Sequence, residues 1–200
     1  MKLYWHPVSL MPWRVRIALA EKGLACDEEI IDLPGGASHQ PEFLALNPFG
    51  QAPVLEDHGR AFAESTAILE YLEEIHPQPP LMPPSPAERA DVRQLMCWSN
   101  GYWMTSWKRW VGPTSMGFLD TPEVRARGRD ELTRHAVVLE ARLERTLWLA
   151  GDYSLADICY TPLLLFADRM GLPLGPATAA WLLRLRDRPA IQGAMGPMLG

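Results

Sequence analysis

The feature that most constrains this chain is a proline-rich run, His76-Pro77-Gln78-Pro79-Pro80-Leu81-Met82-Pro83-Pro84-Ser85-Pro86. Its six prolines fix φ and supply no backbone N–H, so the run is excluded from helix interiors and from the middle of a sheet. We therefore interpret residues 78–86 as a linker. It is expected to separate a domain at 1–77 from a domain at 87–200, and these two regions differ in pattern.

The region before the linker alternates short extended runs with helical ones. Pro12 begins a helical pattern that gathers apolar residues on one face and leaves charged residues such as Arg14 and Lys22 largely elsewhere. The expected elements are strands at Lys2–Trp5, Cys26–Asp32, Pro53–Glu56 and Ala61–Ala63, and further helices at Pro41–Leu46 and Glu64–Ile75. The order β-α-β-α-β-β-α predicts an α/β domain with a small mixed sheet.

The region after the linker shows only helical patterns. Ser85 and Glu88 have the spacing of a capping box around a proline, in which each side chain accepts a hydrogen bond from the other residue's backbone. Thr121 precedes a second long helix, and Ser154 with Asp157 repeats the capping-box spacing. We expect an all-α domain.

The charge and cysteine content narrow the class of protein. The net charge is −5, from 19 basic and 24 acidic residues, and without a basic run the chain offers no footprint for nucleic acid or anionic membrane. The first residues lack a signal peptide's apolar stretch, and no segment is apolar enough to span a bilayer. The three cysteines form no CxxC pair and no metal-ligand pattern, so we expect a cytoplasmic protein without a metal site.

Three short segments before the linker carry candidate binding chemistry, and one of them is Asn47-Pro48-Phe49-Gly50-Gln51-Ala52-Pro53-Val54-Leu55. A cis Ala52-Pro53 bond would turn the chain sharply and direct the backbone N–H and C=O of Ala52 outward. Those two groups would bind an extended peptide as an added strand. A plain trans-proline turn is the alternative, and the segment by itself leaves both open.

Glu64 and Ser65 form the second segment, at the start of a predicted helix. Free N–H groups and the helix dipole make such a position suitable for a carboxylate. The Ser65 hydroxyl adds a donor, and Glu64 can accept from an ammonium group. A ligand that carries both groups, as an amino acid does, fits the pair. A helix-capping role for either residue is the alternative.

The third segment is the loop His6-Pro7-Val8-Ser9-Leu10-Met11-Pro12-Trp13-Arg14, in which Ser9 precedes a helix. Its hydroxyl is placed to donate to a bound thiolate, with the helix end adding a favourable field. A free thiol has a pKa near ~8.5, and one charge-assisted hydrogen bond of roughly 1.5–3 kcal/mol lowers that pKa by about one to two units. A capping role for Ser9 is the alternative.

In this order and spacing, the segments resemble the cytosolic glutathione transferase superfamily over essentially the whole chain. KLYWHPVSLMPWRVRIALAEKGL resembles the first strand and helix of its serine-type classes, especially the zeta, phi and related bacterial branches. NPFGQAPVLED followed by AESTAILEYL resembles the family's cis-proline and glutamyl-binding segments, and WLAGDYSLADI resembles its C-terminal capping box. The resemblance implies a thioredoxin-like N-terminal domain followed by a helical C-terminal domain.

The resemblance also implies roles for particular residues. Ser9 matches the serine that activates the sulfur of glutathione, and Ala52, ahead of a cis-Pro53, matches the residue whose backbone pairs with the cysteinyl part. The remaining implied glutathione contacts are Glu64 and Ser65 for the γ-glutamyl group, Gln51 for the peptide backbone and His39 for the glycyl carboxylate. A solvated loop histidine is the alternative at position 39. Glutathione is then a co-substrate, no further cofactor is implied, and a homodimer is expected.

The loop departs from the family's patterns in two ways. The zeta classes carry Ser-Ser-Cys where this chain has Ser9-Leu10-Met11, which argues against a zeta-type isomerase. The loop also lacks the cysteine of the thiol-transferase classes. Other classes use a tyrosine near Tyr4, which stays an alternative activating residue. The expected enzyme transfers glutathione to a small apolar electrophile; the rivals are a non-catalytic interaction protein and a glutathione-dependent isomerase or dehalogenase.

A tryptophan-rich stretch follows the linker. Trp103, Trp107 and Trp110 are spaced to share one helical face, and Trp13 is a further candidate for the same cleft. The family's arrangement makes these residues a wall for the second substrate. Packing between domains explains the same pattern equally well.

Overall fold

The computed structural model describes residues 1–112 and 119–199, and the chain forms two compact units. The first unit contains Met1–Leu81 together with the segment that begins at Asp187, and the second contains Met82–Arg186. From the sequence we assigned everything after residue 86 to one helical domain. The packing instead returns the C-terminal segment to the first unit.

A four-stranded mixed sheet forms the centre of the first unit, in the order β2-β1-β3-β4. β1 pairs in parallel with β2 and antiparallel with β3, which pairs antiparallel with β4. The strands are β1 (Lys2–Trp5), β2 (Asp27–Ile30), β3 (Val54–Asp57) and β4 (Arg60–Ala63); the helices are α1 (Leu10–Glu21), α2 (Pro41–Leu46) and α3 (Ser65–Ile75). The predicted element order and thioredoxin-like fold are confirmed.

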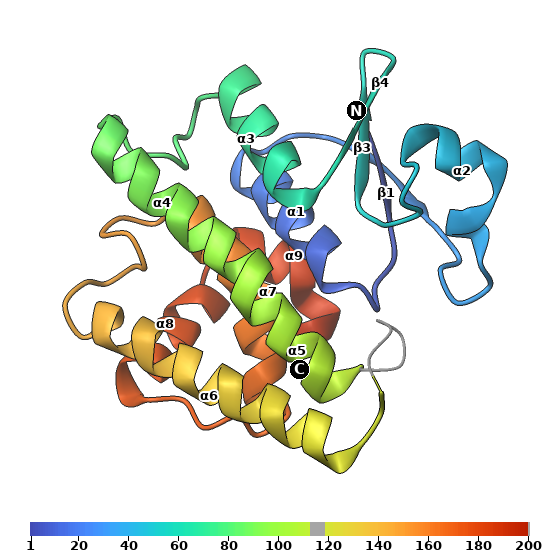
Figure 1. Cartoon of the computed structure of the whole chain (residues 1–200). Helices are drawn as coiled ribbons and strands as arrows, with labels where there is room; N and C mark the ends of the chain where they lie inside the picture. Colours follow the sequence, from blue (N-terminus) through green and yellow to red (C-terminus); the bar gives the residue numbers. More distant parts are fainter. Residues whose placement is uncertain (113–118, 200) are drawn as a thin grey trace. The chain divides into compact units, whose positions relative to one another are not determined.

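The pleat of β1 directs its side chains to two faces of the sheet. Leu3 and Trp5 are buried on one face, where Trp5 meets Trp13 of α1 edge to face with 5.1 Å between ring centroids. Tyr4 points to the other face and meets Phe43 of α2 at 6.2 Å. Helices α1 and α3 therefore lie on one side of the strands and α2 on the other, as Figure 1 shows.

Helix α1 is enclosed by its neighbours rather than buried along one stripe. It packs against α3 and against α9 (Pro189–Leu199). Arg14 and Lys22 are consequently buried, with exposed fractions of 0 % and 7 %. The prediction that these two residues lie largely off the buried face was wrong because it assumed a surface helix with one apolar stripe.

Lys22 joins the end of α1 to the beginning of the linker. Its Nζ lies 2.7 Å from Glu73 Oε2 and donates to the backbone carbonyls of His76 and Pro79 at 2.6 and 3.0 Å. Glu73 also accepts from the backbone N–H of Leu81 at 3.1 Å. Buried charges are tolerated when they are paired and hydrogen-bonded in this way.

Helix α9 is attached to α1 by apolar and polar contacts. Ile191 and Met195 are fully buried. Arg16 Nη1 donates to the carbonyl of Ala194 at 2.6 Å, and Arg188 forms two 2.8 Å hydrogen bonds with Glu21. These contacts are the reason that the C-terminal segment belongs to the first unit.

The regular elements of the second unit are all helical among its described residues, and two isolated β-bridges lie between Trp148 and Asp152 besides. Its elements are α4 (Pro86–Trp98), a π-helical turn (Ser99–Trp103), α5 (Met104–Val111), α6 (Pro122–Leu143), α7 (Leu155–Arg169) and α8 (Pro176–Arg186). The predicted all-α character is confirmed. No helix in the described ranges is long and apolar enough to cross a membrane.

The two predicted capping boxes have different outcomes. Ser154 and Asp157 form theirs at the start of α7. Ser85 is the N-cap residue of α4, but its side chain makes no capping hydrogen bond. Thr121 caps α6 by accepting from the backbone N–H of Val124 at 3.3 Å. The local spacing therefore marks the helix starts, whereas the surroundings decide which side chains bond there.

Candidate functional site

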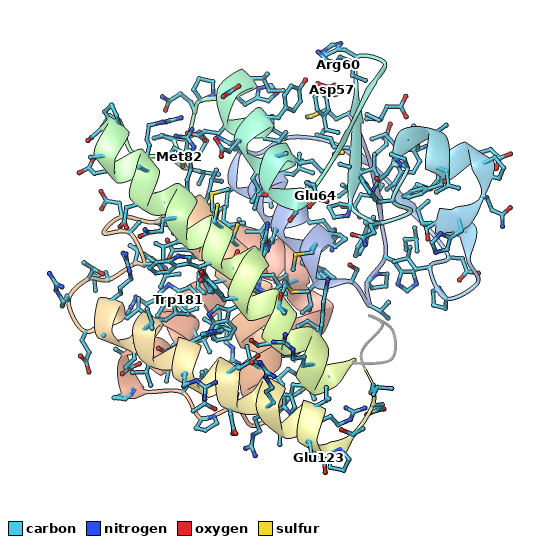
Figure 2. The ribbon with its side chains drawn as sticks, viewed as in Figure 1. Asp57, Arg60, Glu64, Met82, Glu123 and Trp181 are labelled. Carbon is cyan, nitrogen blue, oxygen red and sulfur yellow. The ribbon has the colours of Figure 1, made fainter. Side chains whose placement is uncertain are left out.

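The sheet register brings the predicted site segments to one end of the sheet. Tyr4 pairs with Val54, and Val54 pairs with Ala63, so the end of β1, the start of β3 and the end of β4 lie together. The loop with Ser9 follows β1, Ala52 and Pro53 precede β3, and Glu64 follows β4. Because β2 runs parallel to β1, the loop toward His39 leaves from the same end. Figure 2 shows Glu64 at the opposite end of the β3-β4 hairpin from Asp57 and Arg60.

Ser9 occupies the N-cap position of α1 in extended conformation, with φ −89° and ψ 130°. Its side chain makes no capping hydrogen bond, and the hydroxyl has no hydrogen bond to another described residue. The capping alternative is therefore not what the structure contains. A half-buried hydroxyl at a helix N-terminus remains available to an anionic ligand.

His6 and Trp13 hold the loop that carries Ser9. The carbonyl of His6 accepts from the Ser9 N–H at 3.1 Å, and its Nδ1 accepts from the Val8 N–H at 3.2 Å. Trp13 donates its indole N–H to the carbonyl of Pro7 at 3.1 Å. Since Trp13 is only 2 % exposed, it belongs to the core of the first unit and not to a pocket wall, which corrects its predicted role.

The Ala52-Pro53 peptide bond is cis, so the trans alternative is wrong. Within the described chain, the backbone groups of Ala52 have no hydrogen-bond partner. Asn47, which is 2 % exposed, donates from Nδ2 to the carbonyl of Gln51 at 2.7 Å and accepts from the Phe49 N–H at 3.1 Å. This one side chain therefore holds the loop that leads to Pro53, while the Gln51 side chain is exposed.

His39 ends a short 3-10 turn (Ala37–His39) and lies against the same loop. A Cβ added to Gly50 would meet His39 Nδ1 at 2.8 Å and the Ser38 carbonyl at 2.9 Å, and Gly50 has a φ of +61°. Glycine is needed there both for the backbone conformation and for the close approach. The two segments thus pack together, and His39 itself is exposed beside them.

Glu64 and Ser65 begin α3. Glu64 is exposed and has a φ of +69°, a left-handed conformation that is rare for a residue with a side chain. Such outliers occur where a functional position demands them. Ser65 is 3 % exposed and accepts from Arg14 Nη1 of α1 at 3.4 Å. Glu64, the N-cap residue, makes no capping hydrogen bond, so capping does not explain the pair.

Tyr4 is the alternative thiol-activating residue that the sequence left open. Its hydroxyl donates to Glu56 Oε2 at 3.0 Å, on the face of the sheet covered by α2. Burial and the hydrogen bond to Glu56 raise the pKa of Tyr4. Tyr4 is therefore directed away from the side of the sheet on which α1 lies.

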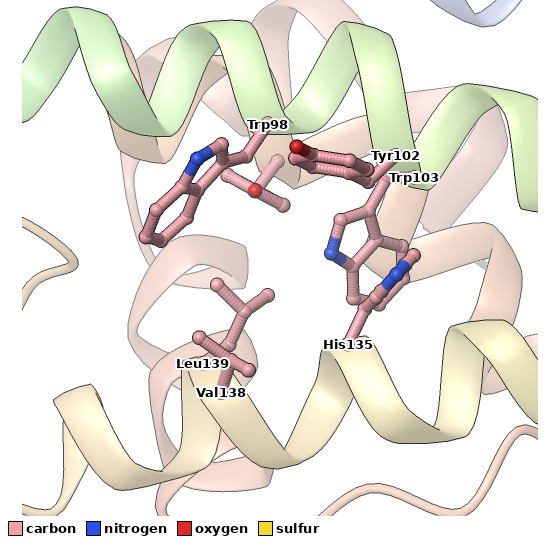
Figure 3. Close-up of a pocket in the computed structure, with 7 residues that line it drawn as sticks. Trp98, Tyr102, Trp103, His135, Val138 and Leu139 are labelled. Carbon is pink, nitrogen blue, oxygen red and sulfur yellow. The ribbon is translucent and has the colours of Figure 1, made fainter.

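An apolar pocket of about 230 Å³ lies within the second unit and contains one of the predicted tryptophans. Trp98, Tyr102 and Trp103 reach it from one side, and His135, Val138 and Leu139 of α6 from the other (Figure 3). Tyr160 of α7 completes the lining. Burial lowers the pKa of His135.

Trp107 and Trp110 lie outside the lining of that pocket. They meet each other edge to face at 5.8 Å on α5, and Trp107 is buried. Of the predicted wall, therefore, only Trp103 lines the pocket. The described residues contain no group of His, Cys, Asp and Glu side chains arranged to hold a metal ion.

Arg14 and Asn47 are two residues at the candidate site that the sequence did not single out. Each is buried and polar and contacts a predicted site residue. For Arg14 a signal existed, because a charged residue lies between Trp13 and Val15 in an apolar helix. For Asn47 the only local sign was its place immediately after a predicted helix.

Two family models match the chain. The model of the glutathione S-transferase N-terminal domain matches residues 3–80, and that of the glutathione S-transferase C-terminal domain matches residues 115–189. Among curated proteins, FtsZ-localized protein A of Caulobacter vibrioides is 34 % identical, with 95 % of this chain and 88 % of that protein covered. Maleylacetoacetate isomerase of Pseudomonas aeruginosa is 34 % identical over 87 % of this chain and 84 % of that protein.

Solved structures agree with these matches. The maleylacetoacetate isomerase of Methylobacterium extorquens AM1, solved with bound malonate and GSH, superposes with a TM-score of 0.85 at 30 % identity, covering 100 % of this chain and 98 % of that one. The two family models and relatives of similar length thus account for both units. The chain belongs to the glutathione S-transferase family.

Proposed function

We propose that this protein is an enzyme that binds glutathione and activates its thiol for attack on a small apolar electrophile. The observation that carries the proposal is the convergence of Ser9, Ala52 and the Glu64-Ser65 pair at one end of the sheet. Each group remains available to a ligand: a hydroxyl without a capping bond, backbone groups without a partner, and a helix start with a left-handed residue.

The proposed ligand is a tripeptide that lies along this end of the sheet. Its cysteinyl backbone would pair with Ala52, its sulfur would face Ser9 and its γ-glutamyl end would meet Ser65, which lies beside Arg14. Gln51 and His39 are proposed to contact the rest of the peptide.

In the proposed reaction the thiol loses its proton to solvent, and Ser9 donates a hydrogen bond to the thiolate. The sulfur lone pair forms a bond to an electrophilic carbon. In a substitution the leaving group departs with the electrons of its bond to carbon. In an addition the π electrons of the attacked double bond move onto the conjugated acceptor group, which then takes up a proton. Neither route needs a covalent bond to the protein.

The second substrate is proposed to be apolar. Trp103 and the aromatic pocket around it suit a flat ring, and Trp107 and Trp110 add apolar surface on the neighbouring helix. The assignment of these residues to the second substrate is part of the proposal. We further propose the cytoplasmic homodimer that is typical of the family, which light scattering would test.

The proposal is tested by titrating the glutathione thiol in the complex, using the ultraviolet absorbance of the thiolate. In the wild type the pKa of the thiol should be about one to two units lower than in Ser9→Ala. Ser85→Ala is the matched control, because Ser85 is also an N-cap serine without a capping bond and lies in the second unit. Equal pKa values in wild type and Ser9→Ala would show that Ser9 does not activate the thiol.

A non-catalytic interaction protein is the second candidate, and the similarity to FtsZ-localized protein A favours it. Such a protein would keep the fold without needing to bind glutathione. Calorimetry with glutathione separates the two candidates. No binding at millimolar glutathione supports the interaction protein and contradicts the enzyme.

Isomerisation is the remaining candidate, and the matches to maleylacetoacetate isomerases favour it. The loop sequence Ser9-Leu10-Met11 speaks against it, as described above. Assays of a maleyl-type cis-alkene and of a panel of aryl and alkyl electrophiles would distinguish the reactions. Turnover of the alkene, with glutathione regenerated and no conjugate formed, would favour the isomerase.

A further inference from the structure

Another cavity, of about 450 Å³, lies within the first unit between the sheet and α2. Tyr4 of β1 and Glu29 of β2 line it on the side of the sheet. Glu42 and Phe43 line it on the side of α2. Because Tyr4 meets Phe43 on the face of the sheet that α2 covers, this cavity lies on the opposite face from α1, the helix that Ser9 precedes.

The cavity combines an apolar floor with acidic groups at its edge. Ile31 and Phe43 belong to a buried apolar cluster against which Leu46 packs, and all three line the cavity. Glu29 and Glu42 line it as well, and both residues are exposed. A cavity of this size and lining suits a small molecule with an apolar body and a positively charged end.

Lys2 shows that the edge of this cavity accommodates an ammonium group. Its Nζ lies 2.7 Å from Glu29 Oε2 and 4.8 Å from the centre of the Tyr4 ring. Both of these groups line the cavity, so the Lys2 ammonium lies at its rim. A carboxylate and the face of an aromatic ring are the contacts by which proteins hold organic cations. The Lys2 and Glu29 side chains are 41 % and 47 % exposed, and an ion pair exposed to this extent is weak enough for a ligand to displace.

The carboxylates around the cavity outnumber the ammonium groups. Glu42 lies in the first turn of α2 and has no hydrogen bond or ion pair with another described residue. Glu56 adds a third carboxylate, which accepts from the Tyr4 hydroxyl at 3.0 Å. Lys2 pairs with only one of the three, so the cavity edge retains negative charge that a cationic ligand would neutralise.

We propose that this cavity is a second ligand site, which binds a small primary amine with a flat apolar body. The body contacts the apolar cluster around Phe43. The ammonium lies over the Tyr4 ring, within reach of Glu29 and Glu42, and takes the place at Glu29 that Lys2 now holds. The site goes beyond the proposed function, because it contains none of the groups assigned to glutathione.

The test compares phenethylamine with two ligands of similar shape: phenethyl alcohol, which is neutral, and hydrocinnamate, which is an anion. Titrations of the full chain followed by amide NMR report both the affinity and the place of binding. The amine should bind about tenfold more tightly than the alcohol, since an ion pair and a cation–π contact both contribute, and the anion should bind most weakly. The shifts should centre on β2 and α2. Equal affinities for amine and alcohol, or shifts centred elsewhere, would overturn the proposal.

Substitutions at the cavity edge identify the groups that hold the amine. Glu42→Gln should reduce the preference for amine over alcohol by about threefold, because it removes one partly exposed ion pair. Glu74→Gln is the matched control, since Glu74 is also an exposed helix carboxylate but lies on α3, outside the cavity lining. An equal preference in Glu42→Gln and Glu74→Gln would contradict the assignment.

Lys2→Gln provides a test that a damaged fold cannot imitate. The substitution removes the ammonium that competes for Glu29, so the amine should bind about threefold more tightly than to the wild type. Unchanged or weaker binding to the folded Lys2→Gln variant would show that the ligand does not take the place of Lys2.

Glutathione separates this cavity from the candidate functional site. The affinity for phenethylamine should be the same with and without saturating glutathione, because the two ligands occupy opposite faces of the sheet. Displacement of the amine by glutathione would place it at the candidate functional site and overturn the proposal. The titrations without glutathione test the cavity by themselves, so their outcome is independent of the proposed function.

Discussion

At the scale of single residues, two buried polar side chains organise the backbone around them. Asp157, fully buried, accepts from the N–H groups of Leu149 and Ser154 at 3.1 and 3.0 Å and from the indole of Trp181 at 2.8 Å. In the loop before Pro53, Asn47 donates to the carbonyl of Gln51 and accepts from the N–H of Phe49. Buried groups with several partners are costly to remove, because every partner is left unsatisfied.

Asp157 is expected to make stability depend on pH. Burial raises the pKa of Asp157 from 3.8 to about 6, so the folded state retains its proton over a range in which the unfolded state has lost it. The free energy of unfolding therefore falls as pH rises from about 4 to 6, by roughly 3 kcal/mol, and is constant above that range. Asp157→Asn removes this titration and leaves the variant less stable at every pH.

Urea unfolding of wild type and Asp157→Asn over pH 4–8 checks this expectation, since the difference between the two curves isolates one carboxyl. The stability advantage of the wild type should shrink between about pH 4 and pH 6. An advantage that grows over this range would mean that the donors around Asp157 outweigh its burial.

Asn47 is expected to affect glutathione binding rather than the chemical step. Asn47→Ala leaves the carbonyl of Gln51 without its donor, and Asn47→Asp keeps an acceptor for Phe49 but also loses that donor. Both variants should raise KM for glutathione by about tenfold, with kcat within about twofold, since one lost hydrogen bond costs roughly 1–2 kcal/mol. Steady-state kinetics measures this. Wild-type KM in Asn47→Asp would show that the donor to Gln51 is not needed.

At the scale of elements, close backbone approach sets the geometry of the second unit. Helix α6 crosses α5 at Gly128, where an added Cβ would lie 2.6 Å from the Trp110 nitrogen and 2.7 Å from the Ser106 carbonyl. Both neighbours are backbone atoms, which cannot move aside as a side chain can. Glu131, one turn further along α6, then pairs with Arg109 of α5 at 2.7 Å.

Gly128→Ala should force α5 and α6 apart. Overpacking of this kind costs about 1–3 kcal/mol, and here it outweighs the gain in helix propensity. Gly101→Ala is the matched control, because a Cβ there meets nothing within 4 Å. Denaturant unfolding should show a lower midpoint for Gly128→Ala only. Equal midpoints for Gly128→Ala and the wild type would contradict the close crossing.

At the scale of the whole chain, the first unit is built from two separated stretches of sequence. Met1–Leu81 and the segment from Asp187 pack together because α9 covers α1. Arg16 contributes on both sides: its guanidinium lies 4.2 Å from the Trp5 ring centre and donates to the carbonyl of Ala194 in α9. The helix that carries Ser9 and Arg14 therefore depends on residues from the far end of the sequence.

Removal of the C-terminal segment from Asp187 should accordingly destabilise the first unit. It would expose the surface of α1 now covered by Ile191 and Met195, each worth roughly 1.5–3 kcal/mol when buried. Thermal unfolding of the shortened chain should begin several degrees below that of the full chain. Arg188→Ala, which removes the pair with Glu21 and leaves Ile191 and Met195 in place, should lower stability by less than the truncation does. An unchanged melting curve would mean that α9 is dispensable.

The sequence by itself determined the order of the elements, the α/β and all-α regions and the segments that carry the candidate site. These features depend on local patterns: proline and glycine positions, alternating apolar residues and helix-start spacing act over a few neighbours. The sequence predicted a small mixed sheet, but the strand order and the pairing of Val54 with both Tyr4 and Ala63 came from the structure.

Only the tertiary structure decided which polar residues are buried and what they contact. Arg14 and Lys22 on α1, and Trp13 beside them, are enclosed because α3 and α9 cover the helix from two sides. No window of sequence around α1 contains that information, since α9 lies more than 160 positions away. The proline-rich run marks a boundary along the chain, but long-range burial, a property of the completed packing, assigns the C-terminal helix to the first unit.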